Sequence, residues 1–502
     1  MTVTLLGGEM LLWSDLDAAH GPPPAGGPAA RPLLGAVSGR TLVAGPHDPE
    51  LLDAIPAEQL TVLVRGVADA EALAARYAGA TVWCGSLEKV AAVPAYDTVV
   101  ALDGLDRLRS AEDGELPWDE TLARLVSVLR PGGRLLLGVE NLFGLHRLVA
   151  LPPALADTDW VVPDDHDPSR PAGPADLRAK LAAAGVAVVR SYAAYPAPVA
   201  PSVLLGPEIL AEPSLAGFVA ATLTTACAAT TGMLADPVRL AVGAARHGLA
   251  TELAPAWTVL AQLATGNVEH ATARSEHGAT GAGPWPDAVV AAGGPGREIR
   301  LADDDLPRGR GLAGLMLAAC QRRDLPALRE LLAGWQDGPA AGVPADRVVV
   351  GADGRCTGLA PAGEPLVALR HFARLVIDGG YAHLWPGAAG EPELTALLAG
   401  MTGRELEPTA VPPAASSTGD SPGSVRELTM ARDRLARELA EARAKHDWYE
   451  QMLGTREAEL KRVRQINAVL SATVPGRAAS TLVGGLRAGK RAMRAVVRRT
   501  RG

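Results

Sequence analysis

The sequence predicts an α/β protein with a doubly wound, mainly parallel sheet, followed by a mainly helical region and a C-terminal coiled coil. Short apolar runs alternate with helical patterns from Thr41 onward, and the connections between them are short. This alternation is typical of a parallel sheet that carries helices on both faces. Beyond residue 425, apolar residues keep a three-four spacing, which predicts the coiled coil.

Each element of the first half follows from a local pattern. Residues 1–40 are rich in Gly, Pro and Ala, and we expect a lead-in helix and loop there. The apolar runs predict buried strands, and the amphipathic segments between them predict helices. Strands are expected at 41–45, 60–64, 81–84, 98–102 and 135–139, and helices at 49–55, at 68–77 and around Leu122, Leu125, Val126 and Leu129.

The segment from Tyr96 to Asn141 reads as one strand-helix-strand unit, in which Pro131-Gly132-Gly133 ends the helix. It resembles the fourth and fifth strands of class I S-adenosylmethionine-dependent methyltransferases. In that family an aromatic-Asp pair, here Tyr96-Asp97, commonly opens the fourth strand, and a Pro-Gly-Gly turn precedes the fifth. The resemblance implies a Rossmann-like, seven-stranded sheet over residues 41–266.

The resemblance also orders the second half of this domain. A helix at 176–185 and a strand at 186–196 look like the family's approach to its sixth strand. Residues 255–266 would form a seventh strand, which the family inserts antiparallel beside the fifth. On this interpretation, residues 197–254 are a helical insertion.

The rest of the chain divides by composition. Two amphipathic helices within 306–336, broken at Asp324-Leu325-Pro326, predict a mainly helical accessory domain. The coiled-coil seam is interrupted by four polar residues, Arg432, His446, Arg456 and Asn467. The expected parts are the accessory domain at 267–407, a Pro/Ser/Gly-rich linker at 408–424, the coiled coil at 425–470 and a basic tail at 471–502.

Charge is distributed unevenly. The net charge is −8, yet residues 460–502 hold 11 Lys/Arg and no Asp/Glu. An acidic body without a recognisable reading domain argues against nucleic-acid binding. The cationic stripe of the tail fits an anionic membrane surface, an acidic polymer or the acidic body of the same chain, and an ordinary solvated face fits it equally.

Cysteine usage and the N-terminus bear on the compartment. The four cysteines form no CxxC pair, so reduced thiols are expected in place of a zinc site or disulfide framework. The first residues lack the basic stretch of a secretory signal, and we expect a cytoplasmic protein. Residues 213–235 are uncharged and long enough for a membrane span, but their Thr, Ala and Gly content favours a buried helix pair.

The resemblance implies that S-adenosyl-L-methionine is the cofactor and that it lies at the carboxyl ends of the strands. Each matching residue also has an ordinary structural interpretation: a strand-to-loop turn for Gly45, a loop hydroxyl for Ser86 and a helix cap for Asp103. The matching residues are Gly45, Pro46 and His47 after the first strand, Gly85 and Ser86 after the third, and Asp103 after the fourth.

Three positions depart from the family's pattern. The turn at Gly45 has one glycine where the family typically has two or three. Arg65 stands where an acidic residue usually accepts hydrogen bonds from the ribose hydroxyls, and a guanidinium cannot accept them. Ser86 replaces the Asp of the adenine turn. These departures favour a protein that keeps the fold without the activity.

Candidates for acid–base chemistry follow the fifth strand. Methyl transfer from a sulfonium depends on in-line alignment more than on a base, and the sequence identifies no catalytic residue. Glu140, Asn141 and His146 lie where a substrate should bind, and His146 is either a general base or a helix-face histidine. Residues 164–167 (Asp-Asp-His-Asp) are either a metal cluster or a solvated turn; the flanking prolines favour the turn, and we expect no metal.

The sequence therefore predicts an enzyme that transfers the methyl group of S-adenosyl-L-methionine to a small-molecule or glycan-type acceptor. The coiled coil at 425–470 would serve self-association. The alternative is a non-catalytic methyltransferase-fold scaffold or binding protein, assembled through the same coiled coil. A nicotinamide-dependent oxidoreductase is a third class, but the chain lacks GxGxxG after a strand.

Overall fold

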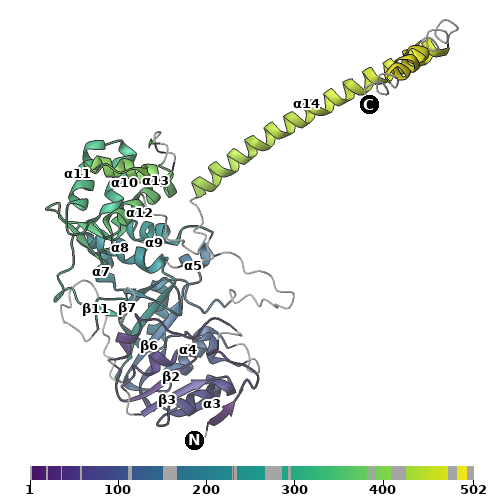
Figure 1. Cartoon of the computed structure of the whole chain (residues 1–502). Helices are drawn as coiled ribbons and strands as arrows, with labels where there is room; N and C mark the ends of the chain where they lie inside the picture. The colour runs from purple at the N-terminus through teal and green to yellow at the C-terminus, as the bar shows by residue number, and fades with distance from the viewer. Residues whose placement is uncertain are drawn as a thin grey trace, which may run out of the picture. The chain divides into compact units, whose positions relative to one another are not determined.

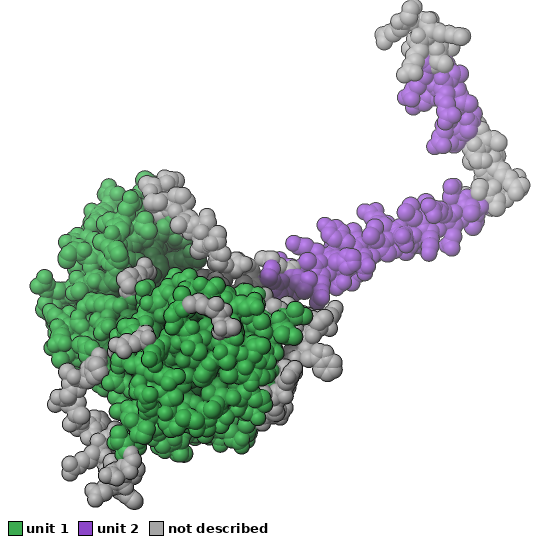
Figure 2. Space-filling model, turned by 90° about the horizontal axis from the view of Figure 1, so that it is seen from below, with its two compact units in different colours: residues 1–425 green, residues 426–502 purple. Residues whose placement is uncertain are grey.

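The computed structural model contains two compact units, residues 1–425 and 426–502, shown in green and purple in Figure 2. The described residues lie within 3–408, 425–472 and 483–494. Within the first range, the residues outside the description are 18–20, 36, 57–58, 111–115, 151–166, 229, 231–233, 266–284, 292–295, 382–383, 386–387 and 389.

An eleven-stranded sheet runs through the first unit (Figure 1). Its order is β1-β4-β3-β2-β5-β6-β9-β7-β8-β10-β11. Neighbours from β1 to β6 in this row pair in parallel, and all later pairs are antiparallel. The strands are β1 (Thr4–Gly7), β2 (Arg40–Ala44), β3 (Gln59–Val64), β4 (Thr81–Gly85), β5 (Tyr96–Ala101), β6 (Leu129–Glu140), β7 (Val186–Tyr195), β8 (Val203–Leu205), β9 (Ala256–Leu263), β10 (Ala288–Val290) and β11 (Arg297–Ile299).

Helices cover both faces of the sheet, because successive strand residues point to opposite sides. On one face, α4, α6 and α8 pack with strand residues such as Leu42, and on the other, α1, α2 and α3 pack with residues such as Val43. The helices are α1 (Arg31–Leu34), α2 (Pro49–Leu52), α3 (Val67–Arg76), α4 (Trp118–Val126), α5 (Leu145–Leu148), α6 (Pro174–Ala183), α7 (Pro207–Ala211), α8 (Ala216–Cys227) and α9 (Pro237–Arg246).

The predicted parallel-rich sheet is confirmed, and its strand count is larger than expected. The seven expected strands are β2, β3, β4, β5, β6, β7 and β9, and β9 lies antiparallel between β6 and β7, as the resemblance implied. Four further short strands, β1, β8, β10 and β11, extend the two edges. Without these additions, β4 and β7 would be edge strands with unpaired backbone groups. β1 pairs with β4, and β8 pairs with β7. The five strand residues Leu42, Leu63, Val82, Val100 and Leu136 are all at most 2% exposed.

Two local expectations were wrong. The helix before the Pro-Gly-Gly turn ends at Val126 and does not reach Leu129, because the Val128 carbonyl accepts the N–H groups of Ala95 and Tyr96 and draws the chain into the sheet. Residues 130–133 then bulge out between the pairs Tyr96–Leu129 and Thr98–Arg134. The lead-in also contributes a strand, β1, in addition to the short helix α1.

Beyond residue 300, a second hydrophobic core lies among helices and a three-stranded sheet. Asp324 accepts the Ala327 N–H at the start of α11, so the expected break between two helices is confirmed. The boundary expected at residue 266 stays a prediction, since β10 and β11 follow it in the chain and still join the first sheet. The elements are β12 (Arg310–Gly311), α10 (Leu312–Arg322), α11 (Leu325–Gln336), β13 (Val348–Val350), β14 (Cys356–Gly358), α12 (Pro365–Asp378) and α13 (Glu391–Met401).

The second unit contains α14 (Val425–Ala472), a single helix of 48 residues. The expected helix is confirmed, and its pairing as a coiled coil stays a prediction. Every side chain of α14 whose burial is described is exposed. Among the described residues, no helix is both long enough and apolar enough to cross a membrane.

Candidate functional site

The six residues expected at a cofactor site lie along the carboxyl edge of the sheet, after β2, β4 and β5. Gly45 follows β2, Gly85 ends β4 and Asp103 follows β5. A Cβ placed on Gly45 would lie 3.6 Å from the Cβ of Asp103. β2 lies between β3 and β5, where the chain's crossovers diverge, and ligands of open α/β sheets bind outside the strand ends at such a point.

His47 ties the ends of β2 and β5 together. Its Nε2 accepts the Leu102 N–H at 3.1 Å, so Nδ1 carries the proton and donates to the Gly45 carbonyl at 3.0 Å. The ring is 2% exposed, and burial lowers the pKa of His47 to about 4. His47 is therefore a neutral structural bridge at pH 7, and both of its nitrogens are already bonded.

The N-terminal segment lies over this edge. We call its described residues, 8–17 and 21–29, the N-terminal cover. Met10 pairs with Gly66 after β3, and Ala25 pairs with His47 after β2. Gly26 donates to the Val199 carbonyl at 2.6 Å, beyond β7. The cover therefore contacts backbone that follows three different strands.

An ion pair fastens the middle of the cover. Arg65 donates to both carboxylate oxygens of Asp15, at 2.7 and 2.8 Å, and its guanidinium lies 5.5 Å from the Trp13 ring centre. Asp69 accepts the Ser14 hydroxyl at 2.5 Å and the Asp15 N–H at 2.8 Å. Burial opposes ionisation of Asp15, but bonds from Arg65 and Trp13 hold its pKa below the usual value.

A second buried arginine joins the cover to Asp103. Arg107 donates to both oxygens of Asp103, and also to the carbonyls of Pro22 and Pro23 at 2.7 and 2.8 Å. Burial raises the pKa of Asp103 to about 7, although Arg107 opposes this rise. Asp103 therefore anchors Arg107 and does not cap the next helix, and its part in cofactor binding stays a prediction.

Two glycines allow the N-terminal segment to approach closely. A Cβ on Gly66 would lie 2.6 Å from the Trp13 carbonyl, and one on Gly85 would lie 2.5 Å from the Gly7 carbonyl. Ser86 is fully buried, and its hydroxyl has no hydrogen-bond partner among the described residues. A hydroxyl in this state is available to a ligand only if the covering chain moves.

The side chains of His47, Ser86 and Asp103 are 2%, 0% and 1% exposed, and Gly45, Pro46 and Gly85 are buried. S-adenosyl-L-methionine does not fit against these residues while the cover is in place, because none of them presents a surface to it. Arg65 closes the position of the expected ribose acceptor by pairing with Asp15.

A second polar cluster lies at the end of β6. Glu140 accepts from His146 Nε2 and Arg147 Nε, both at 2.8 Å, and Arg170 lies 3.9 Å away. Burial favours the neutral acid, but these two hydrogen bonds outweigh it and lower the pKa of Glu140 to about 2. Sequence reasoning missed Arg170, because it follows a Pro-rich loop and reaches the cluster only through folding.

The other two candidates after β6 have different roles. The Asn141 amide donates to the carbonyls of Glu252 and Ala254 at 2.7 and 2.9 Å, so it fixes a loop. His146 donates from Nε2, which leaves Nδ1 as an acceptor. This atom is buried without a hydrogen-bond partner among the described residues, and His146 lines a cavity of about 10 Å³ with Cys227 and Thr230. Such a cavity holds about one water molecule.

Only Asp167 of the acidic loop lies among the described residues. Residues 164–166 lie outside the described residues. Asp167 accepts the Trp118 N–H at 2.7 Å at the start of α4 and also the Ser169 hydroxyl. Asp167 is therefore a helix cap, and no group of acidic, His or Cys side chains in the described part of the chain could hold a metal ion.

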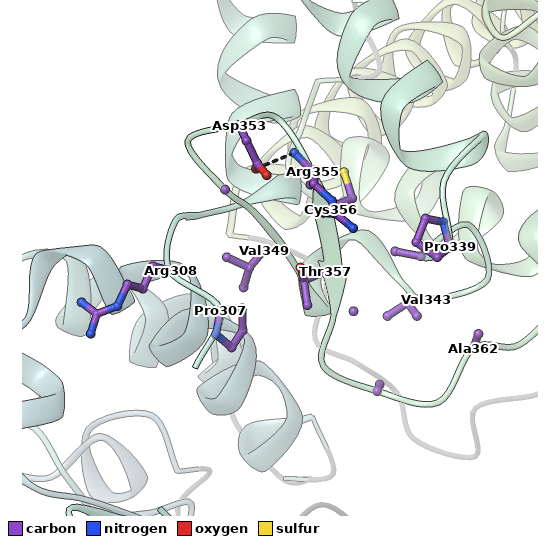
Figure 3. A pocket seen from close by; sticks show the side chains of 14 residues that line it. Pro307, Arg308, Pro339, Val343, Val349, Asp353, Arg355, Cys356, Thr357 and Ala362 are labelled. Carbon is purple, nitrogen blue, oxygen red and sulfur yellow. Dashed lines mark hydrogen bonds between the residues drawn. The ribbon is translucent and has the colours of Figure 1, made fainter. Parts of the chain in front are cut away.

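A larger pocket, of about 500 Å³, lies beside β13 and β14 (Figure 3). The Asp353 carboxylate accepts the Arg355 N–H at 3.1 Å, which closes a turn. Arg308 points away from the other labelled side chains and donates to the Ser214 hydroxyl at 2.9 Å. The side chains of Asp353 and Arg308 are thus engaged in local structure.

No family model matches the chain, and no curated protein matches it. One matching solved structure is a methyltransferase in complex with the Haloferax volcanii Trm112 methyltransferase activator, at 13% identity, covering 47% of this chain and 87% of that one, with a TM-score of 0.29.

Two further matches are described with a ligand. The N-methyltransferase NodS of Bradyrhizobium japonicum, in complex with S-adenosyl-L-homocysteine, is 19% identical over 21% of this chain and 54% of its own, with a TM-score of 0.18. M. jannaschii TYW2, in complex with AdoMet, is 10% identical over 38% and 74%, with a TM-score of 0.22. Scores this low carry no argument, and the resemblance to the class I methyltransferase fold rests on the strand order.

Proposed function

We propose that this chain is a methyltransferase-fold protein whose cofactor edge is closed by its own N-terminal cover. S-adenosyl-L-methionine would bind, and its methyl group would be transferred, only when the cover is withdrawn. The acceptor would be a small molecule or a glycan-type group. When bound, this cofactor supplies an electrophilic methyl group on sulfur.

The observation that supports the proposal is that Gly45, Gly85, Ser86 and Asp103 all lie along the carboxyl edge of the sheet, beneath a segment from the same chain. The cover is joined to this edge by polar contacts, through Asp15 and through the carbonyls of Pro22 and Pro23. Of the described cover residues, Ala25 and Ala29 join the buried core and both side chains are small, so the main cost of withdrawal is the loss of these buried polar contacts.

The second candidate function is a non-catalytic scaffold in which the cover is permanent. The Asp15–Arg65 pair favours it, because this pair fills the position where the family's cofactor ribose would find an acceptor. Breaking a largely buried ion pair on one side is costly, which would keep the edge closed. The two candidates differ in one property: whether the sheet edge binds S-adenosyl-L-methionine after the cover has been loosened.

Calorimetry with S-adenosyl-L-methionine tests the proposal on the full chain. The double variant Trp13→Ala/Asp15→Ala removes the anchors on Arg65 while leaving all six edge residues intact. Asp97→Ala is the matched control, because Asp97 pairs with Arg130 far from the cover and is 41% exposed. If the cover hides a competent site, the double variant binds at least about tenfold more tightly than wild type, and Asp97→Ala equals wild type.

A second measurement reports whether the cover has opened. A Ser86→Cys side chain would react slowly with a maleimide under the cover and quickly without it, with Cys356→Ser added to remove a partly exposed native thiol. Fast labelling of the double variant together with undetectable cofactor binding supports the scaffold. Tight binding by wild type, with Ser86→Cys still protected, contradicts the proposed location of the site.

A further inference from the structure

The helix α14 carries an exposed apolar stripe. Leu435, Leu439, Tyr449, Leu453, Leu460 and Val463 are each 52–65% exposed. Their alternating three-four spacing assigns them to the a and d positions of a heptad, with Leu439, Leu453 and Leu460 at a. A single helix of 48 residues has no core of its own, so this stripe requires a second helix.

The charged residues at the e and g positions beside the stripe indicate which helix can pair with α14. In the same register, Lys445 and Glu459 occupy g positions, and Glu450 and Arg464 occupy the e positions that follow them. In a parallel, in-register pair, g of one helix faces the next e of the other. Lys445 of one helix then faces Glu450 of the other, and Glu459 of one helix faces Arg464 of the other. Because the dimer is two-fold symmetric, each of these ion pairs occurs twice.

Asn467 fixes the direction of the pair. It occupies an a position, and in a parallel, in-register dimer the two Asn467 carboxamides face and can hydrogen-bond each other. Antiparallel pairs that overlap most of the helix instead place Asn467 opposite a leucine, either Leu435 or Leu428. A carboxamide packed on a leucine has no partner, which disfavours those arrangements.

We propose that α14 pairs in parallel and in register with the α14 of a second copy of this chain. The pair is weak at three layers, those of Arg432, His446 and Arg456. Arg456 occupies a d position and lies 3.6 Å from Glu459 of its own helix, and His446 occupies an a position 3.4 Å from Glu450. These residues interrupt the apolar seam and make the dimer reversible.

A charge swap in the full chain, followed by sedimentation across a wide range of concentration, tests the register. Arg464→Glu places a glutamate against each Glu459 and should weaken dimerisation about tenfold. Adding Glu459→Lys to that variant restores opposite charges and should return the dissociation constant to within about threefold of wild type. Arg462→Glu, an equal charge change at an outer c position, is the matched control and should leave it unchanged.

A cysteine at the seam reports the direction independently. Val463 occupies a d position, so Val463→Cys should form a disulfide with its own copy under mild oxidation, identified by peptide mass. Recovery of the dimer in the double swap together with this cross-link confirms the proposal. A wild-type protein that stays monomeric at every concentration overturns it, as does a double swap no tighter than Arg464→Glu alone.

Discussion

The guanidinium of Arg65 bonds both carboxylate oxygens of Asp15, with Nε–Oδ2 at 2.7 Å and Nη2–Oδ1 at 2.8 Å. Asp15 is 3% exposed, and 50 residues separate it from Arg65 in the chain. The pair joins the end of β3 to the N-terminal cover. It therefore holds the cover against this edge of the sheet.

Asp15→Asn should destabilise the first unit by about 2–3 kcal/mol, because it leaves a mostly buried guanidinium without its counter-charge. The urea midpoint measures this loss. Asp97→Asn removes one side of an exposed pair with Arg130 and should cost less than about 1 kcal/mol. Equal losses in the two variants would show that the Asp15–Arg65 pair has no special role.

Gly66→Ala should loosen the cover by placing a Cβ against the Trp13 carbonyl and 2.9 Å from Asp69 Oδ2, the oxygen that accepts the Asp15 N–H. Gly66 has an ordinary φ of −80°, so the conflict comes only from the new Cβ, 2.6 Å from the Trp13 carbonyl. We expect a loss of about 1–3 kcal/mol and faster maleimide labelling of Ser86→Cys. Gly79→Ala, which has open space around its Cβ, is the control. Unchanged labelling in Gly66→Ala would contradict close packing of the cover.

His47 should make the protein sensitive to mild acid. Its pKa is about 4 in the fold against an ordinary 6.5, so the unfolded chain binds a proton in this range that the folded chain does not. The stability is fully present above about pH 6.5 and falls by about 3 kcal/mol as the pH drops toward 4. His47→Gln should remove this part of the loss.

Urea midpoints at several pH values measure that effect. His371→Gln is the control, because the His371 side chain is 41% exposed and lies outside the sheet edge. The prediction fails if wild type and His47→Gln lose stability in parallel between pH 6.5 and 4.

Glu140 should add a second loss of stability in acid, in the same direction as that of His47 but at lower pH. Its pKa is lowered from 4.5 to about 2, so its contribution is present above pH 4.5 and disappears as the pH falls toward 2. Since Glu140 is 28% exposed, we expect Glu140→Gln to cost about 2 kcal/mol at pH 7 and nothing near pH 2. Thermal melts at stepped pH values would show this convergence, and a constant difference would contradict it.

The central strands could be predicted from sequence because each is a continuous apolar run, as Thr98 to Leu102 illustrates. The short strands could not. β1 is only four residues long and half of it is exposed, so its pairing depends on β4, far along the chain. The length of β1 and the pattern of its residues carry no information on which distant strand it pairs with.

The candidate site shows the same limit. The sequence indicated that Arg65 could not accept hydrogen bonds from a ribose, but not that Asp15 would bind it. The opposite charges of Asp15 and of Arg65 and Arg107 were the available signal, in a lead-in otherwise rich in Gly and Pro. Gly45 has a φ of +91°, so Gly45→Val would strain the backbone whether or not a ligand binds there, and it is a poor probe of cofactor binding.

The two outermost strands of the sheet are β1, which begins at Thr4, and β11, which ends at Ile299. A chain leaving the ribosome therefore carries one border of the sheet before the central strands emerge and acquires the other only about 300 residues later. Until then, β8 has no β10 beside it and presents free amide groups to the surrounding solution. The nascent protein must keep that side from pairing with other chains throughout this part of its synthesis.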